Sequence, residues 1–305
     1  MISAYMQKQN RSQTIAGILM ALAACILWSF NFIIARGISK QMTPVAISFF
    51  RWLCASIIII PIAWQRFSSE KHLIAKHWKN ILFATLMGIS LYSPLIYLAG
   101  HYSPAVNLAL IGTTSTPVFT FLIAGILFKE KIPPLSFVGL VICIAGIILL
   151  LSKGSWDAII HFHFTTGDKW MLLGAFFFAV YNILVRKKAK EISSLTYLFV
   201  TFILGTILLL PLYIWEAQIA PPIAWNLNLL LIVLYSGAGT SVAAFFCWNA
   251  AIQRIGSSRT SVFGNLIPVL ASFEAVWLLH ETVTYIQIAS MFIVTVGLIL
   301  ATYKK

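Results

Sequence analysis

Ten apolar stretches follow one another along the chain, and most of them are long enough to cross a bilayer, which takes about 20 helical residues. They lie near residues 15–35, 45–64, 80–99, 104–128, 134–151, 169–185, 194–215, 227–250, 259–279 and 283–302. Lipid offers no partner to backbone polar groups, so only helices and closed barrels span it, and these stretches lack the alternation of barrel strands. The sequence predicts an all-α integral membrane protein with ten transmembrane helices.

The charged residues indicate how the helices are oriented. Only 10% of residues are charged, against about 25% in soluble domains, yet the net charge is +13. With a cytoplasmic N-terminus, sixteen lysines and arginines fall on the cytoplasmic side, four fall outside (Arg36, Lys40, Lys153 and Lys169), and Arg51 lies inside a helix. This positive-inside bias predicts a multi-pass protein of the cell inner (plasma) membrane with both termini cytoplasmic. The basic charge therefore indicates topology and no nucleic-acid partner.

The first half of the chain recurs in the second half, at an offset of 150 and, after a one-residue insertion, of 151. Matching pairs are Gly17 and Gly167, Arg36 and Arg186, Pro61 and Pro211, Ser90 and Ser241, Pro117 and Pro268, and Glu130 and Glu281. The sequence predicts two five-helix repeats, at 15–151 and 166–302. Because five is odd, the second repeat enters the membrane inverted, an architecture that recurs in secondary transporters.

Four segments resemble the EamA-type transporters of the drug/metabolite transporter superfamily. They are "LWSFNF" at 27–32, "FFRW" at 49–52, "TPVFTFLIAGILFKEK" at 116–131 and "IPVLASFEAVWLLHET" at 267–282. The resemblance implies gradient-driven or proton-linked export of amino acids or related small metabolites. Two alternatives stay open: an importer of another metabolite, of the S-adenosylmethionine, choline or nucleotide-sugar type, and a membrane protein without transport activity. A monomer and a homodimer are both compatible with the sequence.

Polar and aromatic residues inside the apolar stretches predict a central substrate-binding cavity, since such residues usually face the protein interior or a water-filled space. The candidates are Trp28, Asn31, Arg51, Tyr97, Tyr181, Ser241 and Trp248. Aromatic walls would hold an ammonium group by cation–π contact, worth roughly 0.5–2 kcal/mol. The alternative is ordinary helix packing, in which these side chains have no ligand.

Two charges lie deep in the predicted membrane, Arg51 and Glu274. At 1.5 Å per residue, both are roughly 8–10 Å below the outer surface. We therefore expect them to interact, either as a fixed ion pair or with Glu274 as a proton-coupling residue that frees Arg51 for a substrate carboxylate. The alternative for Arg51 is a side chain that reaches outward to the membrane surface.

The remaining signals are weaker. Pro117 and Pro268 hold matching places in the fourth and ninth helices, where they are hinge candidates or fixed kinks. Glu130 and Glu281 precede the fifth and tenth helices, where a carboxylate stabilises a helix N-terminus. His161 and His163 have no evident third ligand, so we expect no metal site. No motif for catalysis or nucleotide binding is evident, and we expect no enzyme activity and no cofactor.

Overall fold

The computed structural model describes residues 2–128, 134–157, 164–186, 191–255, 260 and 263–302. Within these ranges the chain is helical and contains no strand. Eight of the helical segments there are long and apolar enough to cross a membrane, and two shorter apolar segments, Gly264–Leu279 and Tyr285–Ala301, follow them. The predicted ten-helix fold is confirmed.

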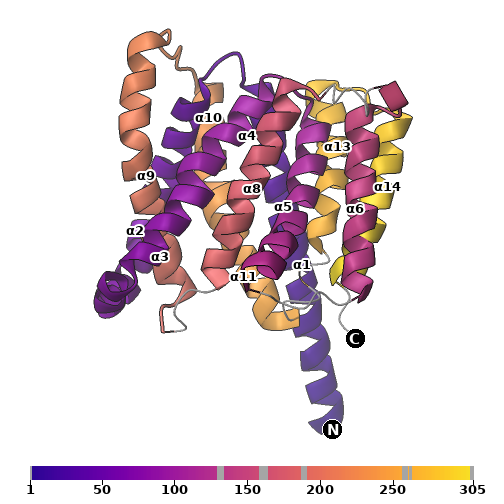
Figure 1. Ribbon diagram of the computed structural model, residues 1–305. Helices are drawn as coiled ribbons and strands as arrows, with labels where there is room; N and C mark the ends of the chain where they lie inside the picture. The colour runs from indigo at the N-terminus through magenta and orange to yellow at the C-terminus, as the bar shows by residue number, and fades with distance from the viewer. Residues whose placement is uncertain are drawn as a thin grey trace.

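The elements of the first half are α1 (Ile2–Gly37), α2 (Pro44–Lys76), α3 (Trp78–Thr85), the π-helix η1 (Leu86–Leu91), α4 (Tyr92–Gly100), α5 (Ala105–Phe128) and α6 (Pro134–Ser152). Those of the second half are α8 (Thr166–Arg186), α9 (Ser194–Ile219), α10 (Leu227–Leu234), the π-helix η2 (Tyr235–Ala243), α11 (Ala244–Ile255), the 3-10 turn η3 (Gly264–Leu266), α13 (Ile267–Leu279) and α14 (Tyr285–Thr302). We call the end of the bundle at which α1 and α4 end the upper end, as it lies in Figure 1.

The surface of the bundle is apolar, which fits a lipid environment. Large side chains such as Trp277, Phe292 and Phe273 lie on it and are more than 70% exposed. Buried positions include many hydroxyl and amide side chains instead, such as those of Ser29, Asn31 and Ser241. This distribution is the one expected of a protein whose solvent is lipid, because polar side chains then turn toward the protein interior.

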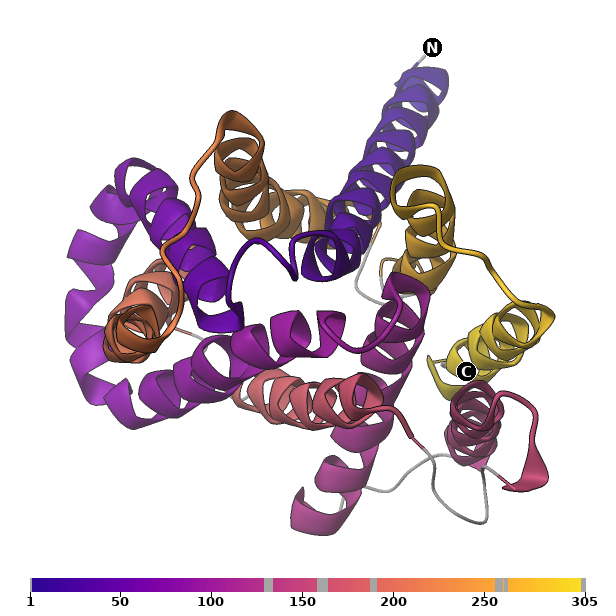
Figure 2. The ribbon, with the colours of Figure 1, turned by 90° about the horizontal axis from the view of Figure 1, so that it is seen from above.

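Helices α2 and α9 lie side by side at one edge of the bundle (Figure 2). They run antiparallel, because the start of each helix contacts the end of the other. They cross where the Ser56 and Thr206 hydroxyl oxygens lie 2.9 Å apart. At the upper end, Glu216 of α9 accepts hydrogen bonds from the Thr43 hydroxyl and from the backbone N–H of Ala46, at the start of α2. A carboxylate there satisfies N–H groups that the first helical turn leaves unpaired.

An equivalent contact, with the roles of the two helices exchanged, lies at the lower end of the same helix pair. Glu70, near the end of α2, accepts hydrogen bonds from the backbone N–H (3.0 Å) and the hydroxyl (2.9 Å) of Ser193, the N-cap of α9. Thr43 and Ser193 are 150 positions apart, and so are Ser56 and Thr206. Each helix of the pair therefore supplies a glutamate to the start of the other.

Helices α6 and α14 lie against each other at the opposite edge (Figure 2), and glycine allows their close approach. A Cβ on Gly139 would lie 2.3 Å from the backbone nitrogen of Ala301, and one on Gly297 would lie 2.8 Å from that of Cys143. No other residue type fits at these two positions without moving the helices apart.

The two halves differ in how their own helices pack. In the first half, α1 packs on α4 and α5, and α2 packs on α4. In the described part of the second half, the equivalent helix pairs pack less closely: this holds for α8 with α11 and α13 and for α9 with α11, which meet through the rings of Phe202 and Phe245, 6.3 Å apart. At the upper end the first-half contact is tight, because the Gly100 backbone lies directly against the carbonyl oxygen of Ala35.

Both halves carry a π-helix at the same place, which the sequence analysis did not predict. η1 joins α3 to α4 and η2 joins α10 to α11, and Ser90 and Ser241 occupy matching positions within them. Pro94, just after η1, has no N–H to offer the Ser90 carbonyl, which favours a wider turn there. Its counterpart after η2 is Phe245, so the proline is not required for this geometry.

Candidate functional site

Four of the predicted site residues meet inside the bundle around the guanidinium of Arg51, which is 7% exposed. Its Nε donates to Ser241 Oγ (2.8 Å), and its Nη1 donates to Asn31 Oδ1 (2.6 Å) and Tyr97 Oη (3.2 Å). The Tyr97 hydroxyl donates to the same Asn31 oxygen, at 3.1 Å. We call Asn31, Arg51, Tyr97 and Ser241 the Arg51 cluster; they come from α1, α2, α4 and η2.

The π-helix η2 shapes the Ser241 side of the cluster. The Ser241 hydroxyl donates to the carbonyl oxygen of Ser236, five residues earlier, at 3.1 Å. The lone pairs of the Ser241 hydroxyl oxygen can therefore accept the hydrogen bond from Arg51 Nε. Gly237 lies in the same segment, and a Cβ there would lie 2.6 Å from Cys54 and 3.0 Å from the Arg51 carbonyl. The absence of a side chain at Gly237 lets η2 approach α2 closely enough for this hydrogen bond.

The charge of Arg51 is not neutralised by a neighbouring carboxylate within the described ranges. The ion pairs found there within 4.0 Å are Arg36–Glu281 and Arg66–Glu70, and neither involves Arg51. All its hydrogen-bond partners are neutral oxygens. An arginine at the centre of a membrane helix costs about 2.5–3.5 kcal/mol on insertion scales, so a buried guanidinium without a counter-charge favours an anion beside it.

The predicted tryptophans lie together next to this cluster. Trp28 is one helical turn from Asn31 on α1, and its ring centroid is 5.1 Å from that of Trp248 on α11. The indole Nε1 of Trp28 donates to the carbonyl oxygen of Thr240, the neighbour of Ser241, at 3.1 Å. Both tryptophans are partly exposed. The pair therefore joins α1 to the second half immediately beside the Arg51 cluster.

Tyr181 lies elsewhere. Its ring stacks on Phe178 and packs with Ile81 and Tyr197, and a Cβ on Gly88 of η1 would lie 2.3 Å from it. The structure thus brings six of the seven predicted binding residues into one region and leaves Tyr181 in a separate apolar cluster.

Glu274 does not pair with Arg51, and the expected direct ion pair is wrong for this conformation. Glu274 Oε1 lies 2.6 Å from the hydroxyl oxygen of Ser29 on α1. Ser29 and Asn31 are two residues apart, about 200° around the helix. They therefore face nearly opposite sides of α1, which stands between the two charges.

The two hinge candidates lie in different settings. Pro117 is inside the continuous helix α5. Pro268 is in the first turn of α13, directly after η3, where a proline costs no backbone hydrogen bond. Phe263, on the other side of η3, is also α-helical, so the 3-10 turn interrupts the α-helix directly before Pro268. Whether either proline acts as a hinge stays a prediction.

Charged residues of the upper end form contacts that the sequence analysis missed. Arg36 Nη1 donates to the carbonyl oxygens of Gly100 (3.2 Å) and His101 (3.4 Å), and Arg36 Nε lies 3.8 Å from Glu281. Glu281 also accepts from the backbone N–H of Ala105, at 3.0 Å. The expected helix capping by Glu281 is found, but at the start of α5. Its repeat partner Glu130 lies outside the described residues.

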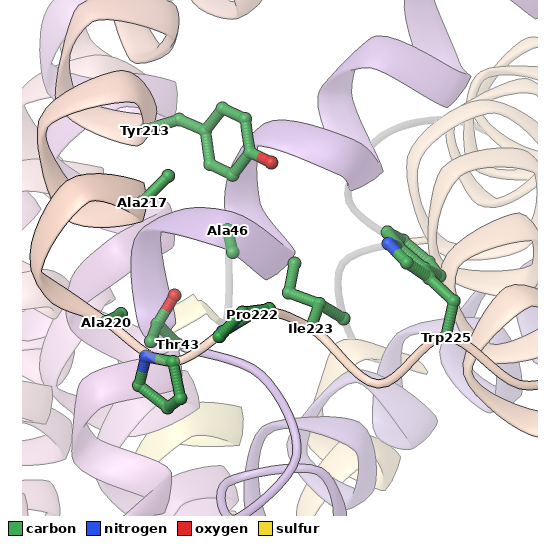
Figure 3. A pocket seen from close by; sticks show the side chains of 9 residues that line it. Thr43, Ala46, Tyr213, Ala217, Ala220, Pro222, Ile223 and Trp225 are labelled. Carbon is green, nitrogen blue, oxygen red and sulfur yellow. The ribbon is translucent and has the colours of Figure 1, made fainter.

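A separate pocket of about 300 Å³ lies at the upper end between α2, α9 and the segment that follows α9 (Figure 3). Its lining residues are Thr43, Ala46, Tyr213, Ala217, Ala220, Pro221, Pro222, Ile223 and Trp225. None of the predicted binding residues is among them. Within the described ranges no group of three His, Cys, Asp or Glu side chains is placed to hold a metal ion, and His161 and His163 lie outside those ranges.

The long apolar helices and the buried polar cluster define the class of multi-pass membrane proteins. Segments 15–152 and 165–303 both match the EamA-like transporter family, and the chain belongs to this family. It is therefore a protein of a membrane-transporter family.

Similar proteins agree with this assignment. An uncharacterized transporter from Archaeoglobus fulgidus is 27% identical, over 94% of this chain and 97% of its own. The uncharacterized transporter YyaM from Bacillus subtilis is 23% identical, over 83% of this chain and 82% of its own. One solved crystal structure, 17% identical, superposes with a TM-score of 0.64 over 95% of this chain and 96% of that one. That likeness concerns the fold alone.

Proposed function

We propose that the protein is a secondary transporter that exports amino acids or related small metabolites across the inner (plasma) membrane, with both termini in the cytoplasm. Residues 15–151 and 166–302 act as two inverted five-helix repeats in this proposal. A solute binds at the Arg51 cluster, beside Trp28 and Trp248. The solute carries a carboxylate or another anionic group, which supplies the counter-charge of Arg51.

The observation that carries this proposal is the environment of Arg51. A buried guanidinium held by three neutral side chains is fixed in position but not neutralised. A carboxylate that binds it forms charge-assisted hydrogen bonds, which are about twice as strong as neutral ones. The neighbouring tryptophan faces are suited to an ammonium group, so an amino acid with both charges fits the residues present.

The packing difference between the halves supports alternating access. The upper end is held by α1 against α4, by Arg36 and by Glu281, whereas the equivalent helices of the second half pack less closely on one another. If the two repeats exchange their conformations, α1 separates from α4 at the upper end, and the equivalent helices α8 and α11 pack together at the lower end. Such an exchange would expose the Arg51 cluster first to one side of the membrane and then to the other.

Purified protein in proteoliposomes tests the proposal, with a panel of radiolabelled amino acids and their uncharged amides under an imposed pH gradient. We expect transport of one or more carboxylate-bearing solutes, none of the matching amides, and loss of transport in Arg51→Gln. Arg254→Gln is the matched control, because Arg254 is exposed at the end of α11. Transport by Arg51→Gln with unchanged apparent affinity would overturn the assigned site, and transport of the amides alone would overturn the substrate class.

A further inference from the structure

A second polar site lies on the face of α1 opposite to the Arg51 cluster. It consists of Ser29 on α1 and Glu274 on α13, which is 9% exposed. Glu274 Oε2 is buried and has no hydrogen-bond partner among the described residues. The repeat partner of Glu274 is Ile123, so the carboxyl group is not required by the repeated fold.

The hydrogen bonds of Ser29 can be counted. Its hydroxyl oxygen lies 2.8 Å from the carbonyl oxygen of Ile26 and 2.6 Å from Glu274 Oε1. A hydroxyl has one hydrogen, so Ser29 donates to only one of these two acceptors. With an ionised Glu274, one of the two short contacts would join two oxygens without a hydrogen between them. With a protonated Glu274, Oε1–H donates to Ser29, and Ser29 donates to Ile26.

The unpartnered Oε2 agrees with this count. In a protonated carboxyl group Oε2 is a neutral carbonyl oxygen. Burying a neutral oxygen without a hydrogen-bond donor costs less free energy than burying a charged oxygen without one. We propose that Glu274 carries a proton in this conformation and releases it in the other, which makes Glu274 and Ser29 the proton site of the transporter. This inference rests on the proposed transport function, but its first test below does not.

The other ionisable groups near Glu274 do not supply a counter-charge. Helix α13 packs on α1, α5 and η3. Within their described ranges, α5 and η3 carry no ionisable side chain. On α1, Cys25 donates to the Phe263 carbonyl oxygen, and Arg36, two turns above Ser29, is engaged at the upper end. Tyr235 of η2 is close enough to interact electrostatically with Glu274, and it is neutral when protonated.

Helix α1 links the two sites. Ser29 binds Glu274 on one face, and Asn31 binds Arg51 on the other, within two residues. Proton release moves the hydrogen from Oε1 to water and leaves a carboxylate. A carboxylate needs hydrogen-bond donors, and the present packing of α1 on α13 does not provide enough of them. A shift of α1 that brings water to Glu274 also moves Asn31 at the Arg51 cluster. Proton binding and solute binding are thereby coupled through one helix.

Infrared spectroscopy of the purified protein in lipid tests the proton site without any transport measurement. We expect a carbonyl-stretching band of a protonated carboxylic acid that disappears in Glu274→Gln and persists in Glu191→Gln, the same change at an exposed residue. Ser29→Ala should keep the band and shift its frequency. Should Glu274→Gln fail to fold, this frequency shift decides: a band unchanged by Ser29→Ala would overturn the proposal, as would the lack of any band that Glu274→Gln removes.

Transport measurements test the coupling. The amide group that Glu274→Gln introduces resembles a protonated carboxyl group but cannot release a proton. We therefore expect this variant to lose accumulation driven by a pH gradient and to keep solute exchange across the membrane. Gradient-driven accumulation at the wild-type level in Glu274→Gln would overturn the coupling. A failure of the Arg51 assignment would appear separately, as transport that Arg51→Gln does not affect, while the Glu274 band remained.

Discussion

The hydroxyl oxygens of Ser56 and Thr206 lie 2.9 Å apart, although the two residues are 150 positions apart in the chain. Residues at matching repeat positions touch each other only where the axis that relates two repeats passes between them. If the halves are the inverted repeats that we propose, α2 and α9 cross on this axis, with the Glu70 and Glu216 contacts at the two ends of the helix pair.

A first prediction concerns this crossing. Cysteines at Ser56 and Thr206, in a background without the four native cysteines, should form a disulfide when oxidised. Because both positions lie on the proposed axis, they stay in contact in both conformations, and the cross-linked protein should still transport. The measurement is cross-linking by gel electrophoresis, followed by transport in proteoliposomes. Complete and reducible loss of transport on cross-linking would show that α2 and α9 separate during the cycle.

The second prediction concerns the packing of α1 on α4. Gly100→Ala places a Cβ 2.1 Å from the Ala35 carbonyl oxygen, a contact that the backbone can relieve only by moving. We expect destabilisation of about 1–3 kcal/mol, measured by thermal unfolding in detergent. Gly174→Ala is the control, because its Cβ would have an ordinary contact at 3.5 Å. Equal unfolding temperatures in both variants would contradict tight packing at the upper end.

A third prediction separates function from stability at Arg51. Arg51→Met removes a buried charge without a nearby carboxylate and leaves the Tyr97–Asn31 hydrogen bond in place. Replacing a buried charge with an apolar side chain of similar size is often neutral or stabilising. We expect an unfolding temperature at or above that of the wild type, together with loss of transport. A marked fall in the unfolding temperature would indicate that Arg51 is mainly structural.

The fourth prediction addresses the capping glutamates of α2 and α9. Glu70→Gln and Glu216→Gln should each lower the free energy of unfolding by about 1–2 kcal/mol, since each weakens hydrogen bonds to a helix start. The two sites lie at opposite ends of the helix pair, so the double variant should show the sum of the single effects. Glu191→Gln should have little effect. Strong non-additivity would mean that the two ends are not independent.

The sequence predicted the helices and all four members of the Arg51 cluster for a physical reason. In lipid, apolar runs give the spans and polar interruptions face inward, so Asn31, Arg51, Tyr97 and Ser241 were all found as candidates. Tyr181 obeys the same rule, but it packs in another part of the interior. Inward orientation alone does not determine which inward-facing residues meet.

The partner of Glu274 could not be predicted, because equal depth in the membrane says nothing about which helix stands between two residues. Arg51 and Glu274 have matching predicted depths, yet α1 separates them. The π-helices were missed for a related reason. One wider turn changes the helical period too little to be seen in an apolar run.

The upper end is assembled from distant parts of the chain: Arg36 contacts Gly100 and His101 of the first half and Glu281 of the second. In the proposed transport cycle, this surface is complete only while α1 is packed on α4. An antibody fragment selected against this surface would bind the present conformation and would not bind the other. Bound there, such a fragment would arrest the cycle without reaching the solute site, and it would hold the molecule in a single state for cryo-electron microscopy.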